Sequence, residues 1–459
     1  MKHTKREPSI WETTDLAALE AFCADYRTFL SDHKTERECV TGMRAALETA
    51  GARELSSLAE AGETPQPGDL VYAEMMKKSL LIFRIGSRPL TGGMQLLGAH
   101  IDSPRMDLKQ HPLYEDEQLA LFDTHYYGGI KKYQWVTLPL ALHGVTAKKD
   151  GEIVEISIGE KEDDPVVGVS DLLIHLSAKQ MTKKMSEGVT GENLNVLIGS
   201  KPLPNTKKEA VKANILALLA EQYGITEEDF ISAEIEAVPA GAARDYGLDR
   251  SMIMGYGQDD RVCSYPAFRA ILDDAVPELT SVCLLTDKEE IGSVGATGMH
   301  SRFFENTVAE LMDALGCYSE LALRRLLTRT RVLSSDVSAA FDPNYPDVME
   351  KNNSAYLGKG PVFNKYTGSR GKSGSNDANA EYIAYLRKTM DAAGIRYQTA
   401  ELGKVDEGGG GTIAYILANL GMEVIDFGVP VLNMHAPWEI TSKADIYETY
   451  RAYKAFLAG

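Results

Sequence analysis

From about residue 251 onward, short apolar runs alternate with longer segments whose apolar residues recur at helical spacing. The runs at 281–285, 331–335 and 422–427 read as strands, and 306–329 between the first two reads as one long helix or two. Parallel strands need a crossover connection, which is usually a helix. The alternation therefore predicts an α/β fold, with a mostly parallel sheet covered by helices on both faces.

The chain between residues 107 and 247 has a different sequence pattern. Its apolar segments are short, interrupted and rich in strand-forming residues. Within it, a strand is expected at 134–143 and a helix at 211–223. Ahead of it, 94–99 reads as a short buried strand of the main sheet. We predict one α/β domain made of 1–106 and 248–459, interrupted by an inserted β-rich domain at 107–247.

Composition limits the classes of function. The 459 residues carry a formal net charge of −18, with 44% hydrophobic and 25% charged residues. These values are ordinary for a globular protein, and the length allows two or three domains. The negative charge argues against a nucleic-acid partner, which favours a basic surface, and it suits binding of divalent cations.

Compartment signals point to the cytoplasm. The five cysteines are scattered and none form a C-x-x-C pair, which is typical of a reducing compartment. Residues 1–9 lack the apolar stretch of a secretory signal. No apolar run reaches 18 residues, so no membrane span is expected.

Residues with metal-binding or acid–base chemistry follow two of the predicted strands. His100 and Asp102 come after 94–99, and alternation along an extended chain puts them on one side, so the carboxylate can fix the histidine tautomer. Glu289 and Glu290 come after 281–285, and as neighbours they point in different directions and can take different tasks. The alternative readings are an unremarkable loop histidine and a solvated acidic pair.

Further candidates stand in similar places. Asp259 and Asp260 precede a helix expected at 264–274, while Asp336 and His435 follow expected strands. Acidic residues at a helix start also act as caps, and a lone histidine after a strand is usually structural. Together, however, these residues lie at the C-terminal ends of strands or in the loops that follow, where open α/β sheets build their sites.

The combined set suits two zinc-like ions roughly 3.5–4 Å apart, as in two-metal hydrolases, with one carboxylate left over as a general base for water. Zn²⁺ fits the mixed histidine and carboxylate set best, and Co²⁺ or Mn²⁺ would also fit.

Other types of functional site fit the sequence less well. Residues 371–373 read Gly-Lys-Ser like the end of a P-loop, but Tyr366 replaces the required earlier glycine and no strand leads into the segment.

Five strings of residues carry a family resemblance. They are Gly98-Ala99-His100-Ile101-Asp102-Ser103-Pro104, Gln258-Asp259-Asp260-Arg261, Asp287-Lys288-Glu289-Glu290-Ile291-Gly292-Ser293, Ser335-Asp336 and Asn433-Met434-His435. In order and spacing the series resembles the M18 family of metalloaminopeptidases over nearly the whole chain. The inserted segment also matches, at 169–176. The family includes aspartyl aminopeptidases and a fungal vacuolar aminopeptidase that prefers neutral residues.

The resemblance implies a ligand set for two divalent metal ions. His100 and Asp336 would hold one ion, Glu290 and His435 would hold the other, and Asp259 would bridge both. The substrate implied is a short peptide whose free α-amino group engages a metal, so that cleavage is restricted to the first peptide bond.

The resemblance also implies roles for three further residues. Asp102 would orient His100, and Glu289 would be the general base that takes a proton from water and passes it to the leaving amine. His175, in the inserted domain, would reach the active site of a neighbouring subunit and help to stabilise the oxyanion. The inserted domain would mediate dimerisation, and the dimers would assemble into a tetrahedral dodecamer.

The expected substrate preference is neutral or broad. Acid-specific members of the family carry a lysine shortly after a Gly-Pro-Val stretch and an Arg-Tyr-Ala string beyond it. Here Lys365 follows Gly-Pro-Val-Phe-Asn, and 368–376 replaces the second string. An acidic side chain needs a cationic pocket, which Lys365 or Lys372 would have to supply. An aspartyl- or glutamyl-specific aminopeptidase is therefore the alternative.

Two alternatives of other kinds stay open at this point. A non-catalytic metal-binding cage protein could keep the fold, although the ligands and the base are all retained here. A related zinc amidohydrolase, such as an acylamino-acid deacylase, would use a similar set of residues on other amides.

Overall fold

A computed structural model describes residues 9–273 and 275–459. Two predictions fall partly outside the described residues. The absence of a secretory signal concerns residues 1–9, of which 1–8 are not described, and the helix expected at 264–274 ends at Asp274, which is not described either. The chain divides into two compact units. The first contains the chain up to Asp102 together with Ala243–Met434 and Glu439–Gly459, and the second contains Ser103–Ala242 and His435–Trp438. The sequence places the corresponding boundaries at 106/107 and 247/248.

The main sheet of the first unit confirms the predicted α/β class. In spatial order its strands are β1 (Arg53–Glu54), β2 (Leu70–Met75), β3 (Ser79–Arg84), β13 (Thr280–Thr286), β4 (Met94–His100), β14 (Arg331–Ser334), β18 (Glu423–Gly428), β16 (Val362–Asn364) and β17 (Gln398–Thr399). The central strands β13, β4, β14 and β18 are parallel to one another. Antiparallel pairings of β3 and β16 flank them.

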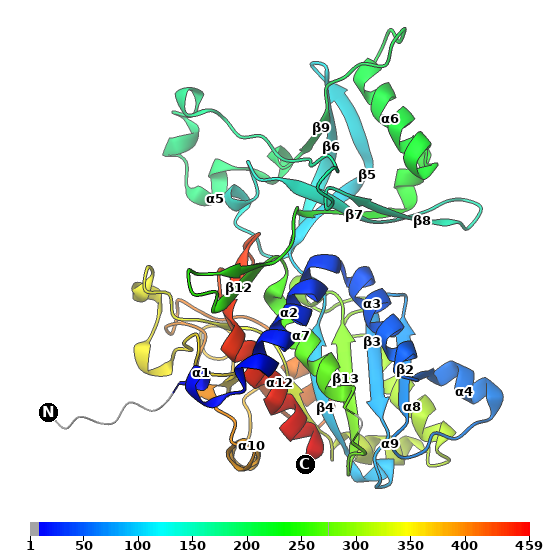
Figure 1. Ribbon diagram of the computed structural model, residues 1–459, viewed down its shortest axis with the longest axis vertical. Helices are drawn as coiled ribbons and strands as arrows, with labels where there is room; N and C mark the ends of the chain where they lie inside the picture. The colour runs from blue at the N-terminus through cyan, green and yellow to red at the C-terminus, as the bar shows by residue number, and fades with distance from the viewer. Residues whose placement is uncertain (1–8, 274) are drawn as a thin grey trace, which may run out of the picture. The chain divides into compact units, whose positions relative to one another are not determined.

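Helices cover both faces of this sheet, as Figure 1 shows. Along β4, Leu97 and Ala99 join one core cluster while Met94 and Leu96 join the other, because successive side chains point to opposite faces. The first cluster contains residues of α2 (Leu16–Asp32), α3 (Glu36–Thr49), α7 (Gln258–Ile271), α10 (Ala380–Ala392) and α12 (Lys443–Ala458). The second contains residues of α4 (Leu55–Ala61), α8 (Phe303–Ala314), α9 (Glu320–Leu327) and α11 (Ala414–Ala418). A short helix, α1 (Ile10–Thr13), precedes α2.

The structure defines two of the predicted helical segments more closely. The segment 306–329 is two helices, α8 and α9, because Gly316 takes a left-handed conformation (φ 68°) that ends the first. The helix expected at 264–274 begins earlier, at Gln258, directly after Gly257 with φ 73°. The acidic pair Asp259-Asp260 stands at this start with non-helical main-chain angles (φ −80°, ψ 105° and φ −115°, ψ 26°), so it forms a kink that the regular turns of α7 follow.

A second, five-stranded sheet in the first unit was not expected. Its order is β11 (Arg244–Tyr246), β12 (Met252–Gly255), β20 (Glu439–Ser442), β19 (Pro430–Leu432) and β15 (Ser338–Ala339). These strands are two to four residues long, too short to show a period-2 pattern in the sequence. The sheet brings β12, which leads into α7, beside β20.

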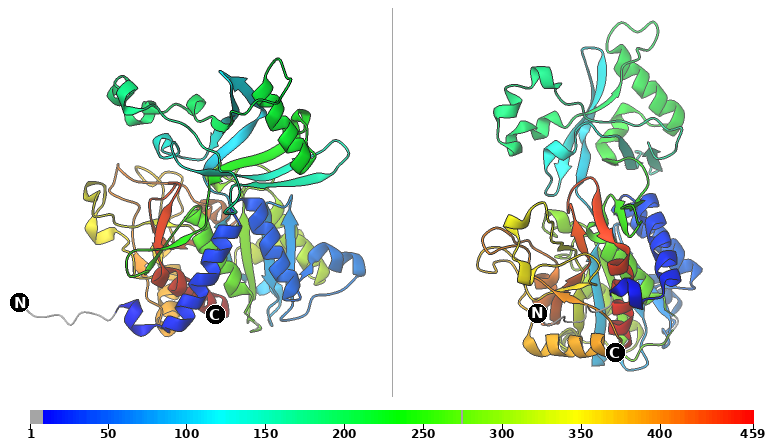
Figure 2. Two further views of the ribbon diagram at one scale, coloured as in Figure 1. Left: turned by 45° about the horizontal axis from the view of Figure 1, so that its top comes forward. Right: turned by 60° about the vertical axis from the view of Figure 1, so that its left-hand side comes forward.

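The second unit is built on an antiparallel sheet, seen in Figure 2. Its order is β8 (Ile153–Ile158), β7 (Leu140–Ala147), β10 (Ala233–Pro239), β5 (Arg105–Asp116), β6 (Leu119–Tyr127) and β9 (Val196–Gly199), with α6 (Ala210–Tyr223) packed on β5, β6 and β9 and a short α5 (Met185–Gly188). The strand predicted at 134–143 was wrong over its first half. Trp135 is buried in a turn, Thr137 has φ 60°, and Pro139 has no N–H, so the strand starts at Leu140.

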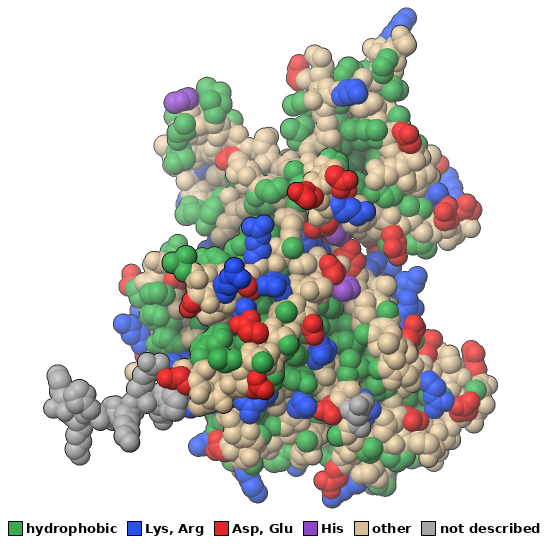
Figure 3. Space-filling model, viewed as in Figure 1, with side chains coloured by type: hydrophobic (Ala, Val, Ile, Leu, Met, Phe, Trp, Pro, Cys, Tyr) green, Lys and Arg blue, Asp and Glu red, His purple; other side chains and the backbone are tan. Residues whose placement is uncertain are grey.

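One face of the molecule shows how its charged side chains are distributed. On the face drawn in Figure 3, acidic and basic side chains are interspersed. Among the described part of the chain, no helix combines the length and the apolarity needed to cross a membrane.

Candidate metal centre

The C-terminal ends of neighbouring parallel strands place four of the candidate residues at one edge of the main sheet. His100 is the last residue of β4, and Asp336 lies two residues beyond the end of β14. Glu289 and Glu290 begin a 3-10 turn, η7 (Glu289–Ile291), that follows β13. Since β13, β4 and β14 are adjacent and parallel, their ends meet at this edge.

His100 lies at the centre of an acidic cluster. Its Nε2 atom is 3.2 Å from Oδ1 of Asp259, 3.9 Å from Oδ1 of Asp336 and 4.0 Å from Oε2 of Glu289. Three groups have ligand atoms within 4.8 Å of one another: His100 with Glu289 and Asp336, His100 with Asp259 and Glu290, and Asp259 with Asp260 and Asp336. The cluster thus joins one imidazole to five carboxylates, a donor set that suits Zn²⁺.

Asp102 contacts the other nitrogen of the His100 ring. The Nδ1 atom lies 3.0 Å from the carbonyl oxygen of Asp102 and 3.3 Å from its Oδ1. Both neighbours are acceptors, so a proton belongs on Nδ1, and Nε2 is the nitrogen that faces the carboxylates and is available to a metal ion. This is the arrangement in which a histidine serves best as a metal ligand.

The same Asp102 carboxylate holds the turn that carries the glutamate pair. Its Oδ1 accepts the N–H of Glu289 and its Oδ2 accepts the N–H of Glu290, each at 3.2 Å. Lys288 precedes the turn with φ 67°. One buried carboxylate therefore fixes both the tautomer of His100 and the position of Glu289 and Glu290.

The cluster has an excess of negative charge. Burial raises the pKa of Asp336 well above its usual range, and the charges of Glu289 and Asp259 raise it further. Burial likewise raises the pKa of Asp260. Burial lowers the pKa of His100, but hydrogen bonds to Asp102 and Asp259 outweigh that effect and leave its pKa raised. A bound divalent cation would relieve the repulsion among these carboxylates.

The remaining two predicted site residues belong to the second unit. His435 lies with its Nδ1 atom 2.9 Å from the carbonyl oxygen of Gly129. His175 lies in an exposed 3-10 turn, η3 (Ile174–Leu176). None of the three groups found among the described residues includes either histidine, and both roles stay predictions.

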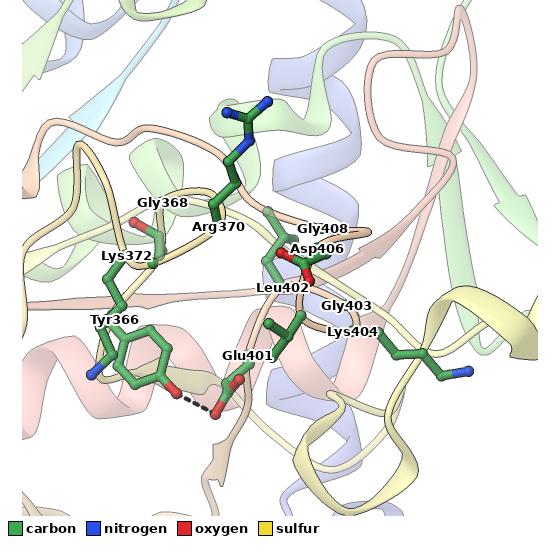
Figure 4. A pocket seen from close by; sticks show the side chains of 13 residues that line it. Tyr366, Gly368, Arg370, Lys372, Glu401, Leu402, Gly403, Lys404, Asp406 and Gly408 are labelled. Carbon is green, nitrogen blue, oxygen red and sulfur yellow. Dashed lines mark hydrogen bonds between the residues drawn. The ribbon is translucent and has the colours of Figure 1, made fainter.

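A pocket of about 230 Å³ in the first unit lies between a hairpin around 366–374 and the loop 401–408, and Figure 4 shows it. The Tyr366 hydroxyl donates to Oε1 of Glu401 at 2.5 Å. The N–H of Gly368 donates to the carbonyl oxygen of Gly410 at 2.6 Å, which ties the hairpin to the glycine-rich segment 408–411. Residues 371–373 thus belong to a tight hairpin.

Asp426 is a further buried acid near the metal centre. It was not identified from the sequence. It stands in β18 opposite Ser334 of β14, and the hydroxyls of Thr412 and Ser334 face it. Burial raises its pKa to about 7, the nearby hydroxyls of Thr412 and Ser334 lower the pKa, and the charge of Glu289 raises it. An aspartate inside an otherwise apolar strand was the available signal.

We expect Asp426→Asn to stabilise the metal-free protein more at pH 8 than at pH 5. The folded pKa of about 7 exceeds the ordinary value of 3.8, so the native state holds one more proton than the unfolded state between these values. Stability therefore falls as pH rises through this window, and asparagine abolishes the fall. Between pH 5 and pH 8, the unfolding free energy of the variant relative to that of the wild type should rise by about 3 kcal/mol, at about 1.4 kcal/mol per pKa unit.

Thermal unfolding at both pH values, in the presence of a chelator, measures this difference. Asp313→Asn, at an exposed position on α8, is the control for removing a carboxylate charge at the surface. Equal shifts for Asp426→Asn would show that its carboxyl group titrates normally.

Comparison with known proteins places the chain among peptidases. Residues 29–457 match the family model described as "Aminopeptidase I zinc metalloprotease (M18)". A curated relative from Clostridium acetobutylicum, a probable M18 family aminopeptidase 1, is 60% identical over 457 residues, which cover 99% of this chain and 98% of the relative.

Two solved structures have the same fold over the same length. Aminopeptidase I from Clostridium acetobutylicum is 56% identical with a TM-score of 0.92, covering 99% of this chain and 100% of the other. An M18 family aminopeptidase from Thermotoga maritima is 47% identical with a TM-score of 0.94, covering 98% of both chains. The similarity extends over both units.

Proposed function

The chain belongs to the M18 family of aminopeptidases, which are zinc metalloproteases, and we propose that it uses two divalent metal ions to remove the N-terminal residue from short peptides. The observation that carries this proposal is the cluster of His100 with five carboxylates, which forms three overlapping groups of three residues whose ligand atoms lie within 4.8 Å of one another in each group. His100 and Asp336 would hold one ion, Glu290 and His435 the other, and Asp259 both. Zn²⁺ fits this donor set best, although Co²⁺ or Mn²⁺ also suits it.

Each part of the site has a separate task in this proposal. When bound, the metal ions polarise the scissile carbonyl and lower the pKa of water. Glu289 takes a proton from the attacking water and returns it to the leaving amine. Its side chain is 15% exposed, so water and substrate can reach it, and Asp102 holds its main chain in place.

Release of free amino acids from short peptides tests the reaction. Each peptide is compared with its N-acetylated form, because an aminopeptidase needs the free α-amino group whereas an acylamino-acid deacylase needs the blocked one. We expect release from the free peptides only, lost on chelation and restored by Zn²⁺. Zinc binding without hydrolysis of any peptide would instead favour a non-catalytic cage protein.

We propose a neutral or broad preference at the N-terminal residue, because the lysines near the pocket are already paired. The Nζ atom of Lys372 lies 3.0 Å from Oδ2 of Asp377 and 3.8 Å from the centroid of the Tyr366 ring. The Nζ atom of Lys365 lies 3.8 Å from the other oxygen of Asp377. An acidic side chain would have to compete with Asp377 for both lysines.

Asp377→Asn should therefore shift the preference toward acidic residues. Removing the carboxylate leaves Lys365 and Lys372 without their anionic partner, and we expect kcat/KM for N-terminal Asp and Glu to rise about tenfold relative to Leu, or about 1.4 kcal/mol. Profiling N-terminal Asp, Glu, Leu, Met and Lys substrates measures it. Asp391→Asn, on the exposed side of α10, is the control. A wild type that already prefers Asp would contradict the proposed preference.

We further propose that the chain forms a homo-oligomer through the second unit, as dimers that assemble into a dodecamer. Apolar side chains around His175 are exposed, with Leu173 at 55%, Ile174 at 69% and Leu176 at 69%. Clustered exposed apolar residues mark interaction sites. A neighbouring copy would cover them and receive His175 in its active site.

Ile174→Asp should break this assembly, because it would bury a charge in the interface. Sedimentation velocity should show smaller species, with activity lost at the same time if His175 acts across subunits. Leu218→Asp, at a 51% exposed site on α6, is the matched control and should leave the assembly unchanged. A wild type that sediments as a monomer would contradict the proposal.

The compartment proposed is the cytoplasm. Each of the five cysteines is a free thiol, and four of them are buried. Thiols kept reduced in this way are typical of a reducing compartment. Fractionation of cells that express the protein at native level tests this assignment.

A further inference from the structure

The main chain at Asp259 is held by a side chain from another element. Asp259 and Asp260 stand at the start of α7, but their main-chain angles are not helical (φ −80°, ψ 105° and φ −115°, ψ 26°), so they form a kink ahead of the regular helix. Oε2 of Glu439, on β20, accepts the N–H of Asp259 at 3.0 Å.

Glu439 is itself fixed on several sides. It is 1% exposed, and its residue pairs with Gly255 of β12 in the second sheet of the first unit. Its carbonyl oxygen accepts a hydrogen bond from Nε2 of Gln258 at 2.6 Å. The Tyr26 hydroxyl lies 3.4 Å from Oε1 of Gln258. These contacts hold the Glu439 carboxylate at the start of α7.

This contact leaves the side chain of Asp259 directed at the cluster. Glu439 accepts the amide N–H of Asp259, and Oδ1 of the Asp259 carboxylate lies 3.2 Å from Nε2 of His100. The main chain of Asp259 is thus held by Glu439, while its side chain faces His100.

We infer that Glu439 is a positioning residue for the metal centre, which fixes the main chain of Asp259 so that its carboxylate points at the metal ions. The inference rests on the proposed function, since it assumes that Asp259 is a ligand. Residues that orient metal ligands typically contribute 10–100-fold to metal affinity. Glutamine at position 439 keeps an acceptor oxygen for the Asp259 amide, whereas alanine does not.

Zinc titration of the metal-depleted full-length protein, in competition with a chromophoric chelator, tests the inference. We expect Glu439→Ala to weaken zinc affinity about 10–100-fold and Glu439→Gln to stay within about threefold of the wild type. Glu448→Ala is the matched control. Glu448 is also 1% exposed and also accepts a main-chain N–H, from Arg396 at 2.7 Å, but it lies in α12 and none of the metal-binding groups includes it.

The outcomes separate the two proposals. A wild type that binds no zinc would contradict the proposed function. A wild type that binds zinc, with Glu439→Ala binding it equally well, would overturn only the role of Glu439. If Glu439→Ala and Glu448→Ala lose zinc affinity equally, the loss reflects general destabilisation of the fold. That result would also overturn the role of Glu439. Because the readout is metal binding, a variant with normal affinity and low activity counts against the inference too.

Discussion

Replacing Glu289 by glutamine should lower kcat about 10²–10⁴-fold, the usual contribution of a positioned general acid–base group. Glutamine keeps the size of the side chain, and the N–H of residue 289 can still donate to Oδ1 of Asp102, so turn η7 keeps its shape. What is lost is the carboxylate that accepts a proton from water. Steady-state kinetics on a short peptide, with metal content measured by mass spectrometry on the same sample, test this expectation.

The metal measurement distinguishes two roles for Glu289. Its ligand atom groups with those of His100 and Asp336, so it lies near enough to serve as a ligand instead of a base. If Glu289→Gln loses both turnover and metal, Glu289 is a ligand. Turnover close to wild type with full metal content would remove it from the proton transfer. Glu310→Gln, on the exposed side of α8, should change neither quantity.

The main sheet could be predicted because its central strands are long and apolar. β4 and β13 are seven residues each and fully buried, so the hydrophobic runs in the sequence coincide with them. Residues just past such strands are then constrained to one edge of the sheet. The strand pattern therefore predicts that His100, Asp336 and the glutamate pair lie at one edge of the sheet, and the structure has them there.

What escaped prediction depends on partners distant in the sequence. Glu439 accepts the N–H of Asp259, 180 residues earlier in the chain, and β20, which carries Glu439, is only four residues long. Asp426 stands out only as an acid in an apolar strand, and its neighbour Thr412 comes from a different loop. The role proposed for His175 rests on the family resemblance alone, because local periodicity does not encode a contact with another copy of the chain.

Removing the bound metal should abolish turnover and lower the thermal stability of the first unit. Burial and the neighbouring charges raise the pKa of Asp336 well above its usual range, so the metal-free cluster holds protons that a cation must displace. Zinc binding should therefore release protons and weaken as pH falls from 8 to 6, by about tenfold per pH unit for each proton released. Zinc at 100 times its dissociation constant should stabilise the protein by about 2.7 kcal/mol.

Calorimetric titration of the metal-depleted protein, in two buffers with different ionisation enthalpies, counts the protons released, and thermal unfolding with and without Zn²⁺ measures the stabilisation. Chelator already saturated with Zn²⁺ is the control, because it leaves the centre loaded and should leave turnover intact. Zinc affinity that does not change with pH would contradict the raised pKa of Asp336. Full turnover in metal-depleted protein would contradict a metal-dependent reaction, because Glu289 alone would then have to activate the attacking water.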